Sequence, residues 1–296
     1  MDILTLFRTF KTQEQCITYL EQARWTGGVT CSYCDSANCY RHASGDRNNT
    51  RWQCADCKST FSVTVGTIFH RTHVPLQNWF LVLALMLNAK KSASSMQIAR
   101  DLGMRQPTVW SMMHRIRVAM AEDQKQSRLL HGIVEADETY IGGKPRKDNF
   151  RNGPMDQNPR GRGTKKALVL GVVERGGRVV AQASKKADGK SIQKFLQRVV
   201  DPNGTLLMTD EWGGYRQYGR QLNWAVINHA TEYANGMIHT NTIEGFWACV
   251  KRAWYGSHHH YSKKYLPLYV AEACYKYNDR KNPKGFASLV EAMLFA

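Results

Sequence analysis

Residues 133–143 read Ile-Val-Glu-Ala-Asp-Glu-Thr-Tyr-Ile-Gly-Gly, a run of β-branched and aromatic residues with three acids set among them. This composition predicts a buried strand with a carboxylate in its middle. The central acid, Asp137, is costly to bury unless it is paired, hydrogen-bonded or bound to a cation. We therefore expect the fold to be organised around this strand.

Two later segments also bring an acid into a predicted element. Residues 206–210 form a second apolar strand that ends in Asp210, and residues 239–247 open a helix that carries Asn241 and Glu244. Each acid alone has an ordinary explanation as a strand cap, a turn residue or a solvated helix charge. The three together raise the question of whether they meet in the fold.

Strands and helices alternate after the first strand. We expect strands over 167–174 and 178–184, a helix over 191–200, a strand over 205–209, a short helix over 215–221, a strand over 224–228 and a helix over 241–254. This order predicts an α/β fold, with a ribonuclease H-like mixed sheet flanked by helices. Other mixed sheets share the same order and stay possible at this point.

Length and charge limit the class of protein. The chain has 296 residues, 43% of them hydrophobic, enough for about two domains with a sizeable core. Its net charge of +17 points to a polyanionic partner, nucleic acid first, although a merely soluble basic protein is the alternative. No apolar run approaches the roughly 20 residues that span a bilayer, and no signal-peptide pattern is visible. We therefore expect a cytosolic protein with reduced thiols.

Four cysteines form two closely spaced pairs: Cys31 with Cys34, and Cys54 with Cys57. Two Cys-x2-Cys motifs at this separation are typical of a structural zinc site, in which four thiolates converge tetrahedrally. Strand-forming residues flank the second pair, which indicates a zinc ribbon. Disulfides or redox pairs are the alternative, and the expected cytosolic setting disfavours them. Cys39 and His42, between the pairs, are interpreted as bystanders.

A helical region follows the ribbon. Residues 76–86 read as a buried helix, residues 94–102 form a short capped helix that Gly103 stops, and Pro107 lies in the first turn of the next helix. This pattern is typical of a helix-turn-helix, whose second helix enters the DNA major groove. A helical hairpin that only packs is the alternative. The residues expected on the reading face are Gln106, Thr108, Ser111 and Arg115.

A basic stretch, residues 142–166, leaves the strand that carries Asp137. It is rich in Gly, Pro and Asn, so we expect a loop, and its basic residues include Lys144, Arg146 and Lys147. Such a loop is well placed to hold a phosphate backbone near the acid. A solvated insert fits the composition equally well.

The helix over 241–254 has a polar and an apolar stripe. Asn241, Glu244 and Lys251 share one face, which would meet the acids of the two strands. Lys251 and Arg252 extend positive charge toward a DNA phosphate. The stripe expected to anchor the helix to the sheet consists of Ile243, Trp247, Val250 and Trp254.

Carboxylates that converge from several elements suit magnesium, which prefers hard oxygen ligands. Two such ions roughly 4 Å apart can activate the attacking oxygen of a phosphodiester exchange and stabilise the leaving oxygen. The neighbouring acids Glu138 and Glu211 are interpreted as decoys, because adjacent residues of a strand point to opposite faces. Glu135 is interpreted as a further decoy.

Together the motifs resemble a bacterial insertion-sequence transposase of the Asp-Asp-Glu class, in the group with an N-terminal zinc ribbon and an Asp-Asp-Asn variant of the triad. The resemblance covers nearly the whole chain and is carried by the two cysteine motifs and by residues 136–143, 209–212, 239–247 and 258–264. It implies that water cleaves DNA at the element ends to free a 3′-hydroxyl, which then attacks target DNA.

The resemblance also implies roles for individual residues. Asp137 and Asp210 map onto ligands of catalytic Mg²⁺ or Mn²⁺. Asn241 and Glu244 both match family positions, and we favour Glu244 as the third ligand for its charge, with Asn241 as a ligand or orienting group. Lys251 and His239 are candidates for contacting the scissile strand. The implied partners are the terminal inverted repeats, target DNA and further copies of the chain, in the bacterial cytoplasm at the nucleoid and without a membrane.

The expected organisation has four regions: an N-terminal helix (1–26), a zinc ribbon (27–70), a helix-turn-helix region (74–124) and a catalytic domain (131–290). Two rival functions stay open. One is a ribonuclease H-like nuclease that cuts without joining. The other is a non-catalytic DNA-binding regulator derived from a transposase.

Overall fold

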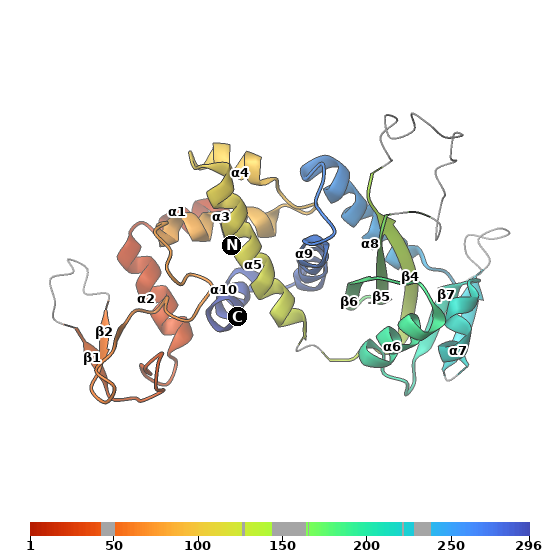
Figure 1. Ribbon diagram of the computed structural model, residues 1–296, viewed down its shortest axis with the longest axis horizontal. Coiled ribbons are helices and arrows are strands. Elements are labelled where there is room, and N and C mark those ends of the chain that lie inside the picture. Colours follow the sequence, from red (N-terminus) through yellow and green to blue (C-terminus); the bar gives the residue numbers. More distant parts are fainter. Residues whose placement is uncertain (43–50, 126–127, 144–163, 165, 221, 228–237) are drawn as a thin grey trace, which may run out of the picture. The chain divides into compact units, whose positions relative to one another are not determined.

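The computed structural model describes the chain except for residues 43–50, 126–127, 144–163, 165, 221 and 228–237 (Figure 1). The chain divides into two compact units. The first comprises Met1–Lys125 with Arg280–Ala296, and the second comprises Gln126–Asp279. Of the helices that the structure describes, none has both the length and the apolar character to cross a membrane.

The first unit combines helices with a small sheet. Its helices are α1 (Ile3–Thr9), α2 (Gln13–Arg24), α3 (Leu76–Asn88), α4 (Ser95–Asp101), α5 (Gln106–Lys125) and α10 (Gly285–Phe295). Its antiparallel sheet has the order β1-β2-β3, formed by Cys39–Arg41, Trp52–Cys54 and Thr60–Phe61. Helix α10 packs against α2 and α5. Residues 280–290, which we expected in the catalytic domain, therefore belong to the first unit.

Local sequence signals set the helix ends of this unit. The Thr12 side chain accepts a hydrogen bond from the Gln15 backbone, and the Gln15 side chain accepts one from the Thr12 backbone, so Thr12-x-x-Gln15 forms a capping box at the start of α2. Ser94 caps α4 by accepting from the Gln97 backbone. Gly103 has a φ of +61°, which lets the chain turn between α4 and α5 at little cost.

The four cysteines of the two motifs converge as a zinc site requires. Their sulfurs all lie within 4.8 Å of one another, with 3.6 Å between Cys31 and Cys57 and 3.6 Å between Cys34 and Cys54. Sulfurs bound tetrahedrally at the usual zinc distance are about 3.8 Å apart, so the cluster fits the ion. Cys39 lies outside this group, with its thiol directed to the Ser36 carbonyl.

The second unit is built on a five-stranded mixed sheet with the order β6-β5-β4-β7-β8. Its strands are β4 (Ile133–Ile141), β5 (Ala167–Glu174), β6 (Val179–Ser184), β7 (Leu206–Asp210) and β8 (Asn223–Ile227). Strand β4 pairs antiparallel with β5 and parallel with β7, and β7 pairs parallel with β8. Numbered along the chain, the strands run 3-2-1-4-5 across the sheet. This is the order of the ribonuclease H-like fold, so the predicted fold is confirmed.

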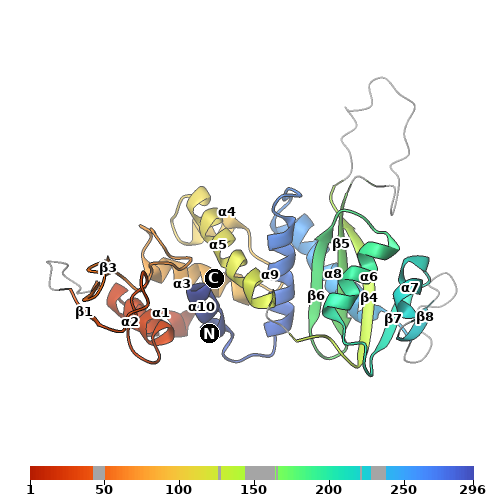
Figure 2. The ribbon, with the colours of Figure 1, turned by 60° about the horizontal axis from the view of Figure 1, so that its bottom comes forward.

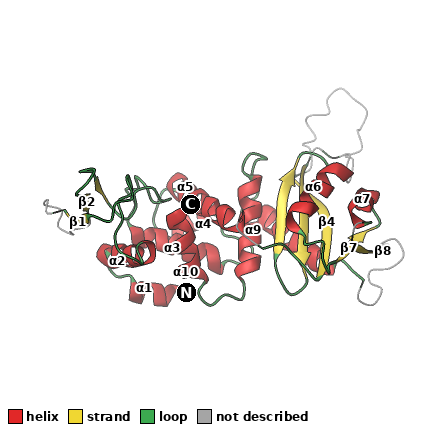
Figure 3. Ribbon diagram, turned by 90° about the horizontal axis from the view of Figure 1, so that it is seen from below, coloured by secondary structure: helices red, strands yellow, loops and turns green. Residues whose placement is uncertain are grey.

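Helices cover both faces of this sheet, as the yellow strands and red helices of Figure 3 show. Helix α6 (Gly189–Val199) packs on one face together with a 3₁₀ turn (Gly213–Tyr215) and α7 (Arg216–Gly219) (Figure 2). The other face carries α8 (Asn241–Arg252), a π-helical turn (Ala253–Ser257) and α9 (Leu266–Asp279). The predicted apolar stripe of α8 is confirmed, because all four of its members are buried.

A buried carboxylate fixes the start of α8 to β4. Glu135 has 0% of its surface exposed and accepts hydrogen bonds from the backbone of Thr242 (2.8 Å) and Ile243 (3.0 Å), and from the Thr242 hydroxyl (2.9 Å). The first N–H groups of a helix have no partner within it, and the helix dipole favours a negative charge at this end. Glu135 therefore holds α8 against the central strand.

The same carboxylate is neutralised by a cation from another element. Arg175, just after β5, donates from Nε to Glu135 at 2.6 Å. Its Nη2 also donates to the carbonyl of His239 (2.8 Å) and to His239 Nδ1 (2.9 Å), directly before α8. The ion pair thus ties together the central strand, the β5–β6 turn and the entry to α8.

We predict that removing zinc unfolds the ribbon selectively. One zinc ion per chain is expected by elemental analysis, and a strong chelator or Cys54→Ser should release it, because four thiolates are needed to close a structural site. Hydrogen exchange should then rise in residues 27–70 and stay unchanged in β4 and β5. Cys39→Ser is the matched control and should keep its zinc. Equal zinc loss in both variants would contradict the four-cysteine assignment.

We predict that Glu135→Ala loosens α8. The substitution leaves Arg175 without its carboxylate, and breaking a buried pair in this way typically costs about 3 kcal/mol or more. Hydrogen exchange at the Thr242 and Ile243 amides should accelerate strongly, and the melting temperature should fall. Glu211→Ala, which removes an exposed acid of the same unit, is the control and should change neither. Unchanged protection of α8 in Glu135→Ala would show that apolar packing alone holds the helix.

Candidate functional site

Asp137 and Asp210 lie side by side on neighbouring parallel strands. Strand β4 pairs with β7 so that Glu135 lies opposite Met208. The recorded pairs end there, two residues before Asp137 on β4 and two before Asp210, the last residue of β7. The charge of Asp210 lies close enough to raise the pKa of Asp137. Because side chains alternate along a strand, Asp137 points to the same face as Glu135, toward α8. The structure thus brings together two acids that are far apart in the sequence.

The carboxyl group of Asp137 lies in an environment that opposes its ionisation. Burial raises its pKa to about 7, and the negative charges of Glu138 and Asp210 act in the same direction. Trp247 of α8 donates one hydrogen bond from Nε1 to Asp137 Oδ2 at 3.0 Å, which lowers the pKa only in part. Asp137 is therefore a desolvated acid whose charge is incompletely balanced by the protein.

A glycine makes room for this contact. Gly171 of β5 lies opposite Asp137 in the sheet, and a Cβ atom placed there would come within 2.4 Å of the Trp247 ring. No real Cβ tolerates that distance, so the indole can lie against the sheet only where residue 171 has no side chain. Gly171 thereby positions Trp247, and Trp247 in turn reaches Asp137.

The polar residues predicted on α8 lie beside this contact. Glu244 and Lys251 precede and follow Trp247 by three and four positions, so they share its side of the helix. Glu244 is exposed, and its Oε1 accepts a hydrogen bond from Thr240 at 3.2 Å. Asn241, the first residue of α8, is also exposed.

The three acids do not form a closed cluster of ligands. Within the part of the chain that the structure describes, only the four cysteines bring three or more ligand atoms of Cys, His, Asp or Glu within 4.8 Å of one another. The carboxylates of Asp137, Asp210 and Glu244 are therefore not all within that distance of one another. The decoy acid Glu138 points to the opposite face, where it accepts a hydrogen bond from the Tyr215 hydroxyl at 3.0 Å.

The residues predicted to read DNA have mixed surroundings. Gln106 donates to Ser95 of α4 at 2.8 Å, and Arg115 donates to the carbonyls of Ile68 (2.9 Å) and His70 (3.1 Å). Both side chains thus take part in holding the first unit together. Of the other predicted contacts, Ser111 and Arg252 are exposed, Thr108 is half-buried, and Lys144, Arg146 and Lys147 lie outside the described residues.

Sequence reasoning missed the residues that position the acids. Glu135 lies two positions before Asp137 and so shares its face, a signal that the strand period carries. Gly171 interrupts an apolar strand, which often marks a close approach of another group. The pairing of Arg175 with Glu135 has no sequence signal, because the two residues are brought together only by the sheet.

Comparisons with known proteins agree with this architecture. Residues 11–60 match a family model described as a transposase zinc-ribbon domain, which covers the four-cysteine cluster. An uncharacterized protein in transposable element ISH50 of Halobacterium salinarum is 28% identical over 271 residues, spanning 89% of this chain and 90% of that protein.

Solved structures of low similarity include the Mos1 strand transfer complex, at 15% identity and a TM-score of 0.30, covering 73% of this chain and 74% of that one. The Mos1 mariner paired end complex with Mn has 15% identity and a TM-score of 0.30, covering 72% and 74%. Because these TM-scores are low, the fold assignment rests on the strand order of the sheet.

The decisive match is that of the second unit. Residues 129–278, which include β4 to α9 with Asp137, Asp210 and Glu244, match the model of the ISXO2-like transposase domain. The chain therefore belongs to the ISXO2-like transposase family.

Proposed function

We propose that this transposase cleaves DNA at the ends of its element and joins them to target DNA, with divalent cations held between Asp137 and Asp210. The observation that carries the proposal is the placement of the two carboxylates on adjacent parallel strands, one of them desolvated. A buried acid with an incompletely balanced charge is a frequent mark of a reactive site.

The donor set fits magnesium or manganese. Both ions take hard oxygen ligands, and magnesium commonly uses one or two carboxylates, with waters and substrate phosphate oxygens completing the shell. A cation beside Asp137 would favour its ionised form and offset the repulsion from Asp210. Bound cations would activate the attacking oxygen and stabilise the leaving oxygen of the phosphodiester.

The protein groups around the pair have separate tasks in this proposal. Trp247 orients Asp137 through its hydrogen bond and excludes water from one side of the carboxylate. Glu244 is the proposed third metal ligand, because it lies on the same side of α8 as Trp247, which contacts Asp137. Asn241 is proposed either to orient Glu244 or to bind the metal in its place. Lys251, on the same side of the helix, is proposed to contact the scissile strand.

DNA is the proposed partner of both units. A net charge of +17 supports attraction to the phosphate backbone, and the exposed Ser111 of α5 lies where a recognition helix would meet bases. We further propose that several copies of the chain act together on paired element ends, which is the arrangement that joining two ends to one target requires.

The first test is the reaction itself. With DNA that carries the element ends and with Mg²⁺ or Mn²⁺, we expect cleavage and strand-transfer products from the wild type. Asp137→Asn and Asp210→Asn should each lower both steps at least about a hundredfold, because each removes charge that holds the cations. Glu211→Gln, which changes the exposed acid next to Asp210, is the matched control and should stay active.

Other outcomes would favour the rival functions. Cleavage without joined products would identify a nuclease. Full DNA processing by Asp137→Asn would contradict the proposed site. Comparing Glu244→Gln with Asn241→Ala identifies the third ligand, since loss of a ligand should raise the metal concentration needed for half-maximal rate.

We also predict a pH-dependent stability effect of Asp137. Its folded pKa of about 7 exceeds the unfolded value near 3.8, so unfolding releases a proton between these values and stability falls as the pH rises through this window. Asn at this position removes that penalty. The advantage of Asp137→Asn over the wild type should widen by about 2 kcal/mol between about pH 5 and about pH 8.

Thermal melting of the metal-free protein, followed at both pH values, checks this prediction. Added Mg²⁺ should stabilise the wild type at the higher pH and leave Asp137→Asn nearly unchanged, because only the carboxylate gains from the cation. A variant no more stable than the wild type at either pH would show that the Asp137 charge is already balanced within the protein.

A further inference from the structure

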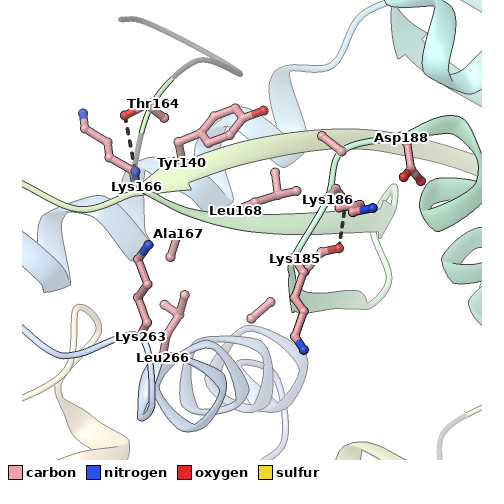
Figure 4. Close-up of a pocket in the computed structure, with 13 residues that line it drawn as sticks. Tyr140, Thr164, Lys166, Ala167, Leu168, Lys185, Lys186, Asp188, Lys263 and Leu266 are labelled. Carbon is pink, nitrogen blue, oxygen red and sulfur yellow. Dashed lines mark hydrogen bonds between the residues drawn. The ribbon is translucent and has the colours of Figure 1, made fainter. Parts of the chain in front are cut away.

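The second unit contains a large cavity that the proposed reaction does not use. It has a volume of about 780 Å³ and opens where β5 begins and β6 ends, as Figure 4 shows. Apolar side chains, Leu168 and Leu266 among them, line part of it, and Tyr140 of β4 forms one wall. Its volume lies within the range of about 300 to 1,000 Å³ that is usual for ligand sites.

Four lysines surround this cavity: Lys166, Lys185, Lys186 and Lys263. They come from the start of β5, the segment after β6 and the segment before α9, three parts of the chain that the fold brings together. The one acid of the lining, Asp188, caps α6 by accepting from the Ser191 backbone at 2.8 Å. We name this lysine-lined cavity the lysine pocket. Its net positive charge favours an anionic ligand.

Three of these lysines retain charge that the described part of the protein does not use in ion pairs. Among the described residues, no carboxylate lies within ion-pair distance of Lys166, Lys185 or Lys186. Lys185 and Lys186 are exposed, as is Lys263. Positive charges gathered over an apolar floor suit a ligand with both anionic and apolar parts, such as a sugar–phosphate backbone.

The lysine pocket lies at the end of β4, beyond the acids. Tyr140 follows Asp137 by three residues along β4, a rise of about 10 Å, and its ring packs on the α6 face of the sheet, opposite the face that carries Asp137. A smaller cavity of about 190 Å³ shares Tyr140 and Lys166 with the pocket and is lined by Lys251 and Tyr255. Lys251 lies on the side of α8 that carries Glu244, so the smaller cavity adjoins both the lysine pocket and this side of the helix.

An exposed aromatic ring lies at the smaller cavity. Tyr255, in the π-helical turn after α8, is 62% exposed although it lines the smaller cavity. Rings in such positions stack on unpaired bases, and lysines beside them hold the backbone. Turns of π-helix are themselves frequent at functional sites.

We propose that the lysine pocket binds the phosphate backbone of the DNA strand whose reacting phosphate lies between Asp137 and Asp210. The position of the strand rests on the proposed function, whereas DNA binding by the pocket does not require catalysis. The element end and the target DNA share this backbone chemistry, and the test below distinguishes them.

The test measures DNA binding by the full chain without divalent metal, so that no reaction takes place. The double variant Lys185→Gln, Lys263→Gln should lose about tenfold in affinity, and the slope of log Kd against log salt should fall by about two, one for each lost phosphate contact. The matched control is Lys190→Gln, Lys194→Gln, which removes the same charge from exposed lysines of α6 outside the lining. It should change affinity less than about twofold.

Two duplexes identify the source of the strand. One carries the terminal repeat found beside the coding region, and the other is of unrelated sequence. If the pocket variant loses affinity for both duplexes, the lysine pocket binds any DNA backbone. If it loses affinity for the repeat alone, the pocket binds the element end. If it loses affinity for the unrelated duplex alone, the pocket binds the target. Equal binding by the pocket variant and the control on both duplexes would overturn the inference, with melting temperatures confirming that both variants fold.

Failure of the proposed function has a different signature. If the wild type never cleaves DNA but the pocket variant loses affinity, the proposed reaction is overturned and DNA binding by the lysine pocket is supported. If the wild type cleaves and joins DNA but the pocket variant binds and reacts like the control, only the inference about the lysine pocket is overturned.

Discussion

The second unit depends on one buried ion pair at the centre of its sheet. Glu135 accepts the first N–H groups of α8 and the guanidinium of Arg175, and so fixes a helix to a strand more than 100 positions away in the sequence. A helix attached only by apolar packing could slide or rotate by a residue. With its first turn bound to a single carboxylate, α8 has one register against β4, which places Trp247 at Asp137. The geometry of the acids therefore rests on a residue that takes no part in their chemistry.

The contrast between Glu135 and Asp137 shows how one strand face can serve two purposes. Both acids lie under α8, two residues apart, with Glu135 fully buried and Asp137 half-buried. Glu135 is surrounded by donors and a cation, so its charge contributes to folding. Asp137 receives one indole hydrogen bond and lies beside other carboxylates, so its pKa rises to about 7. A central acid that the protein leaves short of positive charge is suited to an external cation, and the adjacent structural acid keeps the surrounding fold in place without it.

Much of this architecture follows from local patterns in the sequence. Strand alternation, the capping box at Thr12 and the cysteine spacing each predict the structure found, because each depends on residues close together in the chain. The order of the strands in the sheet does not follow from any local pattern, although the alternation of strands and helices limits the number of possible folds. The sequence does not reveal contacts between residues that only the fold brings together. Examples are the ion pair of Arg175 with Glu135 and the cluster of lysines at the start of β5. Arg115 has a partner that its helical position does not reveal: its DNA contact stays a prediction, while its guanidinium donates to the carbonyls of Ile68 and His70.

The close contact between Gly171 and Trp247 has a consequence for how this family can diverge. A side chain at residue 171 is compatible with the fold only if the ring at residue 247 becomes smaller in the same lineage. A smaller residue at 247 alone would leave a gap against β5 and remove the donor of Asp137. Either substitution made alone therefore destabilises the contact between β5 and α8. Residues 171 and 247 are expected to covary in alignments of homologous sequences.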